Sequence, residues 1–325
     1  MEAKEKIKLL EPLIGKTPLY ELKFPEFNGN KVFAKAEFLN PTGSHYDRVY
    51  LELFKTLLQK NPLPKDLIEV SSGNAGISFA YFCKYLGFKA EIIIPAAVRT
   101  NARQIIRRIN PEITISLSQG KYLEGAVEYL KNRLTPGVGL TPEFLNHSRR
   151  QETLSATEKI ALESLEQLNY LGINKIDYFV AACGNGSTII GPGRVLKKNN
   201  EETKIIVFEP QEAPVGYCKK TGEKPTESDH YKHIMYGTGA WGIEFPFIHK
   251  DMYGFSNMVE KVVRITKKEF DEALLLRFKV PWDVGYTSLN ALYVVQSIIN
   301  ETKCKNCTFL TIFYDTGEKY AQVGD

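Results

Sequence analysis

Three glycine-containing turns hold the residues whose types and spacing could bind an anionic ligand. They are SSGNAG at 71–76, CGNGST at 183–188 and NPTGSHYDR at 40–48. Each turn follows a predicted strand and precedes a predicted helix, and open parallel sheets bind their ligands at such junctions. Glycine lets the backbone approach a ligand closely, and the first amides of a helix have no intrahelical acceptor. The three turns are therefore the first candidates for a binding site.

The turns at 71–76 and 183–188 offer different groups to a ligand. In the first, Asn74 supplies both a donor and an acceptor, although the segment taken alone is also compatible with a simple tight turn. In the second, small residues and two hydroxyls can surround a phosphate dianion at a helix start. No lysine follows its second glycine, so it is not a P-loop, and a nucleoside triphosphatase is not supported.

The third turn predicts only a turn followed by a helix. Pro41 and Gly43 mark the turn, and Ser44 or Asp47 could cap the helix that begins at Tyr46.

The elements around these turns follow an alternating pattern. Short apolar, β-branched runs alternate with longer amphipathic stretches, which indicates parallel strands connected by helices and hence an α/β fold. The predicted strands lie at 31–38, 66–72, 90–95, 175–183, 204–210 and 307–315, and the clearest predicted helices at 75–86, 153–168 and 289–299. The segment at about 211–260 is the least regular, and such long loops are commonly functional coverings.

Composition restricts the class of partner. The chain has 325 residues, 43% hydrophobic and 25% charged, with a net charge of +4. No dense basic block argues for nucleic acid or an anionic membrane, and no stretch is long and apolar enough for a membrane helix or a signal peptide. The sequence thus predicts a cytoplasmic protein with a small-molecule ligand. Its five cysteines do not resemble a disulfide framework, and Cys304 and Cys307 are interpreted as an ordinary reduced pair, with a metal or redox role as the alternative.

Together the turns resemble the fold-type II pyridoxal-phosphate family, which includes cysteine synthase, cystathionine β-synthase, threonine synthase and serine/threonine dehydratases. GKTPLYEL at 15–22 is similar to the family's opening G-x-TPL stretch, EFLNPTGSHYDR at 37–48 to its NPTGSxKDR motif, and YDTGEKY at 314–320 to its closing DSGxRY. These motifs occur in order over nearly the whole chain. The resemblance implies a two-domain fold of mostly parallel twisted sheets, a larger lobe from 1–40 and 146–325, a smaller substrate lobe from 41–145, and a homodimer.

The resemblance also assigns roles to residues. The loop at 71–76 would hold the substrate carboxylate and the ring hydroxyl of the cofactor through Ser71, Ser72, Gly73, Asn74 and Ala75. The cofactor phosphate would lie against Gly184, Asn185, Gly186, Ser187 and Thr188, and Ser288 would meet the pyridine nitrogen. HIMYGTGAW at 233–241 is similar to the family's ring-covering flap, so His233 and Gly237 would line the same cleft.

One position departs from the family at the centre of its chemistry. The residue before the DR pair is the family's Schiff-base lysine, and here it is Tyr46. A phenol cannot form an imine, and it can act as acid or base only if its surroundings bring its pKa from about 10 towards neutrality. Val49 and Leu289 also replace glycines of the family's motifs, which favours a natural lineage with lost or altered chemistry. Lys35 and Lys16 are expected to be solvated rather than to replace the lysine, and His45 could supply a base or a ligand contact.

Three hypotheses follow from this departure. The first is a lyase or transferase of amino-acid metabolism that holds pyridoxal phosphate non-covalently. The second is a non-catalytic pseudoenzyme that binds a phosphorylated or carboxylated metabolite, or a partner subunit. The third is a different reaction on the same scaffold, with Tyr46 as acid or base.

Overall fold

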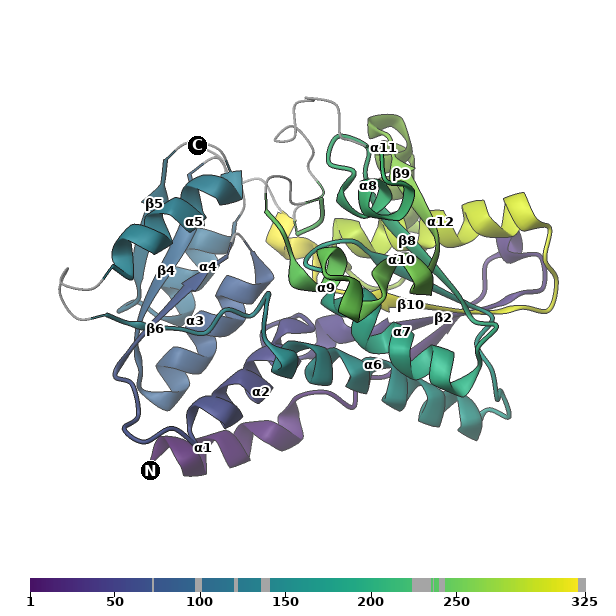
Figure 1. The fold of residues 1–325 in the computed structure, drawn as a ribbon. Helices are drawn as coiled ribbons and strands as arrows, with labels where there is room; N and C mark the ends of the chain where they lie inside the picture. The colour runs from purple at the N-terminus through teal and green to yellow at the C-terminus, as the bar shows by residue number, and fades with distance from the viewer. Residues whose placement is uncertain are drawn as a thin grey trace.

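Two sheets, each flanked by helices, make up the fold of the computed structural model (Figure 1). The structure describes residues 1–71, 73–96, 101–119, 122–135, 141–223, 235, 237–239 and 243–320. The larger sheet has six strands in the order β1 (Leu19–Leu22), β2 (Lys31–Ala36), β10 (Thr308–Phe313), β7 (Tyr178–Ala182), β8 (Lys204–Pro210) and β9 (Val259–Ile265). The smaller has four, in the order β5 (Thr114–Ser118), β4 (Lys89–Pro95), β3 (Asp66–Val70) and β6 (Glu143–Phe144).

Strand pairing is parallel throughout both sheets except between β1 and β2. Parallel strands covered on both faces are apolar along their whole length, which is why the sequence showed continuous runs rather than alternation. All five residues of β7 and all six of β10 are buried. The predicted α/β fold with mostly parallel sheets is confirmed.

Helices connect the strands and cover the sheets. Beside the smaller sheet lie α3 (Asn74–Leu86), α4 (Ala102–Ile109) and α5 (Tyr122–Arg133), on the left of Figure 1. The other helices of eight or more residues are α1 (Ala3–Leu10), α2 (Tyr46–Leu57), α6 (Gln151–Tyr170), α7 (Ser187–Asn199), α11 (Lys267–Leu274) and α12 (Tyr286–Thr302). Shorter ones are α8 (Val215–Thr221), α9 (Pro246–His249) and α10 (Phe255–Met258). The helix predicted at 75–86 ends as expected at Gly87, whose φ of 85° is the left-handed conformation that glycine favours.

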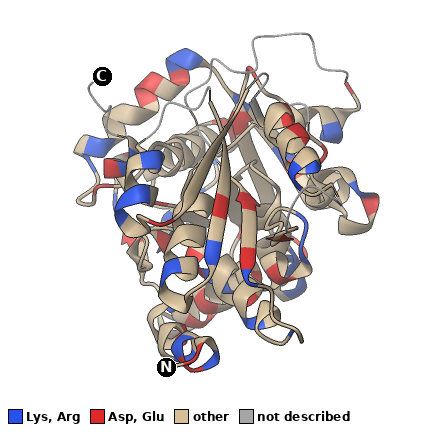
Figure 2. Cartoon of the chain, turned by 90° about the vertical axis from the view of Figure 1, so that its left-hand side faces the viewer, with Lys and Arg blue, Asp and Glu red and all other residues tan. Residues whose placement is uncertain are grey.

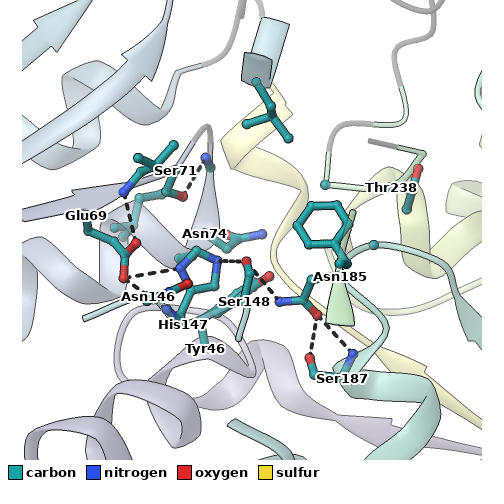
Figure 3. Close-up of a pocket in the computed structure, with 18 of the residues that line it drawn as sticks. Tyr46, Glu69, Ser71, Asn74, Asn146, His147, Ser148, Asn185, Ser187 and Thr238 are labelled. Carbon is teal, nitrogen blue, oxygen red and sulfur yellow. Dashed lines mark hydrogen bonds and ion pairs between the residues drawn. The ribbon is translucent and has the colours of Figure 1, made fainter. Parts of the chain in front are cut away.

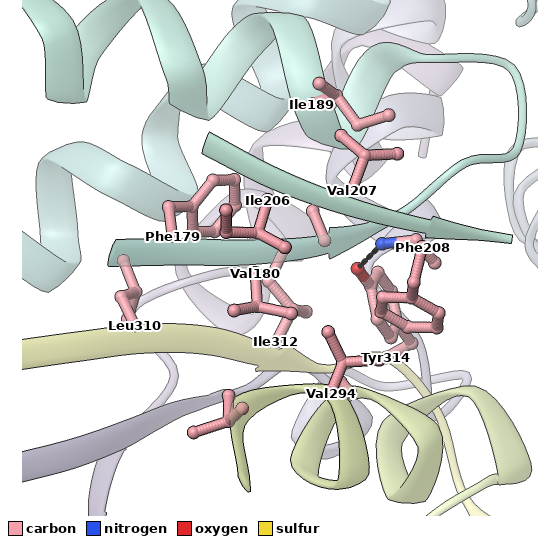
Figure 4. Packing of buried hydrophobic residues seen from close by; sticks show 14 of the residues in the cluster. Phe179, Val180, Ile189, Ile206, Val207, Phe208, Val294, Leu310, Ile312 and Tyr314 are labelled. Atoms are coloured by element: carbon pink, nitrogen blue, oxygen red, sulfur yellow. Dashed lines mark hydrogen bonds between the residues drawn. The ribbon is translucent and has the colours of Figure 1, made fainter. Parts of the chain in front are cut away.

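The core of the larger sheet is formed by β7, β8 and β10 with α12. Phe179, Val180, Ile206 and Leu310 pack together here (Figure 4). The Tyr314 hydroxyl accepts a hydrogen bond of 2.8 Å from the Ala182 amide, which links the ends of β10 and β7. The carboxyl ends of these strands are thereby held together where the second turn begins.

The larger sheet draws its strands from residues 19–36 and 178–313, and the smaller from 66–144. Helix α1 packs against α2 and α3. The predicted lobe boundaries near 41 and 145 stay a prediction. In the described residues no helix is long and apolar enough to cross a membrane. In the view of Figure 2, the positions of basic and acidic residues are interspersed along the chain.

A buried ion network fixes the start of α2. Arg48 donates to both carboxylate oxygens of Glu37, at 2.7 and 2.8 Å, and to both of Glu163, at 2.6 and 2.7 Å. Lys35 is fully buried and lies 2.9 Å from Glu163, so the expectation that Lys35 is solvated is wrong. The charge of Lys35 is balanced by a carboxylate from α6, a contact that local sequence does not reveal. Lys16 is exposed, as expected.

Candidate functional site

A cavity of about 590 Å³ takes its lining from both sheets and from the closing segment of the chain (Figure 3). It brings together turns that are more than a hundred residues apart in sequence. The predicted site residues that line it are Tyr46, His45, Ser71, Gly73, Asn74, Ala75, Gly184, Asn185, Ser187, Thr188 and Gly237. Ser72 and His233 lie outside the described residues. The loop at 71–76 and the turn at 184–188 therefore face one space.

The turn at 184–188 is shaped to bind an anion at the start of α7. Asn185 Oδ1 accepts from the amide and hydroxyl of Ser187, at 3.0 and 2.7 Å, which closes the turn. The amides of Gly184, Gly186 and Thr188 have no acceptor among the described residues. Gly186 has φ of 90°, and a Cβ there would come within 2.8 Å of Ile248. Free amides at a helix N-terminus favour a negatively charged ligand.

Two residues that were predicted to contact the cofactor do not line the cavity. Gly186 and Ser288 are not among the residues that line the cavity. Gly186 shapes the turn, while the fully buried Ser288 hydroxyl accepts a 2.9 Å hydrogen bond from the Tyr314 amide. The Ser288 hydroxyl keeps its proton free to donate.

Gly237 packs against the turn at 184–188. Its carbonyl oxygen would lie only 2.4 Å from a Cβ added at Gly184, so Gly184 is a position where only glycine fits without a shift. Nearby, the Gly239 amide donates to the Cys183 carbonyl at 2.9 Å. The described residues 237–239 of the segment that resembles a flap thus contact the turn at 183–188 directly.

The loop at 71–76 presents the start of α3. The Ser71 hydroxyl accepts from the Gly76 amide at 2.8 Å and so turns inward to brace the loop. The amides of Asn74 and Ala75 have no acceptor among the described residues. A carboxylate placed here would meet two helix-terminal amides.

Neither predicted catalytic side chain is tuned for proton transfer near neutral pH. Tyr46 is half-buried on the cavity wall, and burial raises the pKa of its phenol, with the charge of Glu69 adding to the effect. That direction is opposite to the one an acid or base needs, so the third hypothesis loses chemical support. Burial lowers the pKa of His45 to about 4, which keeps its ring neutral at pH 7. The rings of His45 and Tyr46 are in contact, with centroids 4.3 Å apart and planes tilted by 37°.

The predicted capping of α2 is wrong. His45 precedes the helix and no side chain caps it. Asp47 instead accepts from the Thr42 amide at 2.7 Å and from the Ser78 hydroxyl at 2.6 Å, so it holds the turn at 40–48 against α3. Ser44 Oγ is buried and makes no hydrogen bond within the described part of the chain. A side chain caps a helix only if it faces the free amides of the first turn. Here the Asp47 carboxylate faces Ser78 of α3 instead.

Sequence reasoning missed a row of polar side chains beside Tyr46, whose ring centroid lies 5.5 Å from that of His147. Glu69 Oε2 lies 3.3 Å from His147 Nδ1, and His147 Nε2 is 3.1 Å from the Ser148 hydroxyl. The Ser148 hydroxyl in turn lies 3.5 Å from Asn185 Nδ2. This contact connects Glu69, His147 and Ser148 to the turn at 184–188 (Figure 3). The available signal was Glu69 itself, because a carboxylate inside a buried apolar strand requires a partner.

Comparison with known proteins decides the family. The model of one family, described as "Pyridoxal-phosphate dependent enzyme", matches residues 10–298. The chain belongs to this family. Cysteine synthase B of Campylobacter jejuni is 30% identical over 325 residues, covering 98% of each chain.

Solved structures of the pyridoxal-phosphate family carry the same fold. A hydrogen sulfide-producing enzyme of Fusobacterium nucleatum superimposes with a TM-score of 0.78 at 28% identity, covering 97% of this chain and 90% of that one. An O-acetyl serine sulfhydrylase of Entamoeba histolytica superimposes with a TM-score of 0.80 at 24% identity, with the same coverage. The second likeness shows the fold alone.

The cavity fits one end of pyridoxal phosphate better than the other. The free amides and small residues at 184–188 suit its phosphate. At position 46 the cavity presents a phenol, which cannot form an imine with the aldehyde of the cofactor. The family implies the cofactor, the free amides at 184–188 could accommodate its phosphate, and position 46 carries no lysine.

Proposed function

We propose that this chain binds pyridoxal phosphate in the cavity and acts on a small amino acid, as a cysteine-synthase-like lyase or transferase. The observation that carries the proposal is the convergence of two helix starts, at 74 and 187, on one cavity of about 590 Å³. One suits a phosphate and the other a carboxylate, the two anionic ends of a cofactor with an amino acid beside it.

The cofactor supplies an electron-withdrawing ring that stabilises charge at an amino-acid α-carbon. The chain's part is to place and shield the reactants. The amides at 184–188 orient the phosphate, and those of Asn74 and Ala75 orient the substrate carboxylate. Phe245 and Ile243 contribute apolar cover, which strengthens electrostatic contacts inside the cavity.

We propose that His147 acts as the acid or base of the reaction, through its Nε2 atom. Glu69 lies at its Nδ1, which favours the tautomer with the proton there and leaves Nε2 to accept from Ser148. Tyr46 and His45 are poor candidates because burial shifts both pKa values away from neutrality. Replacing His147 with Gln should lower kcat more than it weakens cofactor binding, since His147 reaches the turn at 184–188 only through Ser148.

We base the substrate class on the relative of 30% identity. That protein is a cysteine synthase B, so we propose a serine derivative with a leaving group on its β-carbon. The test is desalting after incubation with pyridoxal phosphate, followed by an assay of cysteine formation from O-acetylserine and sulfide. Cofactor retention with turnover supports the proposal. Loss of the cofactor on desalting, together with no turnover, contradicts it.

A second candidate function is ligand binding without turnover. Tyr46 favours it, because the motif at 37–48 resembles one with a Schiff-base lysine at this position and burial raises the pKa of the phenol. Retention of the cofactor with no turnover of any β-substituted serine would decide for this candidate.

A further inference from the structure

Lys319 is a second position on the cavity wall where the chain departs from a motif of the family that it resembles. The closing segment YDTGEKY resembles DSGxRY, so Lys319 stands where that motif has arginine. Lys319 lies in a short 3-10 helix, Gly317–Tyr320, and lines the cavity while being only 7% exposed. Tyr46 lines the same cavity. The chain thus has a phenol where the family motif has an amine, and an amine where it has a guanidinium.

The amine of Lys319 is held between the first and third turns. Its Nζ donates three hydrogen bonds of 2.8 Å, to the carbonyl oxygens of Thr42 and Gly43 and to Asn74 Oδ1. A Cβ on Gly43 would come within 3.3 Å of Nζ, so the glycine leaves room for this amine. The amine is therefore positioned by the turn at 40–48, which contains Tyr46, and by the loop at 71–76.

Burial opposes the positive charge of Lys319, whereas the three hydrogen bonds that its ammonium donates favour that charge. Burial lowers its pKa, partly opposed by the charges of Asp315 and Asp47. A desolvated lysine with a lowered pKa is the usual form of a nucleophilic lysine. Asp315 is held by Asn74 Nδ2 at 2.6 Å and by the Tyr320 hydroxyl at 2.7 Å, and its buried Oδ1 has no partner among the described residues.

Other lysines are less suitable. Lys131 lines the cavity from α5 but is exposed. Lys35 is tied to Glu163 in the ion network, and neither it nor Lys16 lines the cavity. Lys319 is the buried lysine on the cavity wall in the part of the chain that the structure describes.

From this placement we infer that Lys319 takes over covalent attachment of the cofactor, an inference that rests on the proposed binding of pyridoxal phosphate. The ammonium first loses one proton to water. The Nζ lone pair then attacks the aldehyde carbon, the aldehyde oxygen leaves as water with the two remaining amine hydrogens, and a carbon–nitrogen double bond forms. No oxidant or reductant is consumed. Asn74, released from Nζ, becomes free to meet the ring hydroxyl next to the aldehyde.

Borohydride trapping tests the inference without relying on turnover. The full-length protein is incubated with equimolar pyridoxal phosphate, reduced, digested and mapped by mass spectrometry, while a parallel unreduced sample is dialysed to measure bound cofactor. We expect the pyridoxyl adduct on Lys319. The Lys319→Arg variant, which restores the family's residue and keeps the charge, should retain cofactor but lose the adduct. Lys131→Arg is the matched control and should keep it.

The outcomes separate the inference from the proposed function. Cofactor retained by the wild-type protein without an adduct on Lys319, or with the adduct on Lys131, would overturn the inference and leave binding intact. No retained cofactor in the wild-type protein would overturn both. An undiminished yield of adduct on another residue in the Lys319→Arg variant would also contradict attachment through Lys319.

Discussion

Replacing Glu163 with Gln tests whether the buried ion network holds α2, and with it the turn at 40–48, in place. Burial alone would raise the pKa of Glu163, but the hydrogen bonds and charge of Arg48 and the charge of Lys35 outweigh it and lower the pKa to about 2, from an ordinary 4.5. Each pKa unit corresponds to about 1.36 kcal/mol, so the charged carboxylate stabilises the fold by about 3 kcal/mol at neutral pH. Because the side chain is 20% exposed, we expect about 2 kcal/mol after solvent screening.

The stabilisation by Glu163 should depend on pH in one direction. A carboxylate whose pKa is lower in the folded than in the unfolded chain stabilises the fold above pH 4.5, and this contribution is lost as the pH falls towards 2. Glutamine cannot titrate, so the gap in unfolding free energy between wild type and variant should shrink by about half or more between pH 6 and pH 3.

Urea denaturation at the two pH values measures this gap. Glu166→Gln on the exposed side of the same helix is the matched control, and it should change the unfolding free energy by less than about 0.5 kcal/mol. Equal penalties for Glu163→Gln at both pH values, or a penalty no larger than that of the control, would refute the reasoning.

Three further predictions concern the cavity. Tyr46→Lys should place a further amine on the cavity wall, beside those of Lys319 and Lys131, and reduction of the cofactor-loaded variant with borohydride should give an adduct at position 46; its absence would show that this wall does not face the aldehyde. Gly184→Ala should raise the Kd for pyridoxal phosphate about tenfold or more in equilibrium dialysis, because its Cβ would meet the Gly237 carbonyl at 2.4 Å and overpacking costs ~1–3 kcal/mol; an unchanged Kd would contradict the close approach. Tyr314→Phe should lower the unfolding free energy by about 1–3 kcal/mol in chemical denaturation, since the buried Ala182 amide loses its acceptor, and a neutral effect would argue against that bond.

Local pattern was enough to predict most of the fold. The apolar runs that became β7, β8 and β10 are continuous because both faces are buried, and Gly87 marked the end of α3. The turns at 71–76 and 183–188 were placed correctly at strand-to-helix junctions. These features depend on residues close in sequence or on one periodic signal.

The remainder depended on contacts between distant segments. Lys35 looked like a solvated strand residue until α6 supplied Glu163, and Asp47 looked like a cap until α3 supplied Ser78. The chain from Glu69 through His147 to Ser148 joins residues about eighty positions apart, and Lys319 reaches Thr42 across most of the sequence. Spacing within a motif carries no information about such pairs.

The most direct measurement of the central claim is the stability of the protein in pyridoxal phosphate compared with pyridoxal, which lacks only the phosphate. If the turn at 184–188 binds the phosphate, pyridoxal phosphate at a hundred times its Kd should raise the unfolding free energy by about 2.7 kcal/mol, while pyridoxal at the same concentration should raise it far less. Equal stabilisation by both compounds, or none by either, would contradict the account.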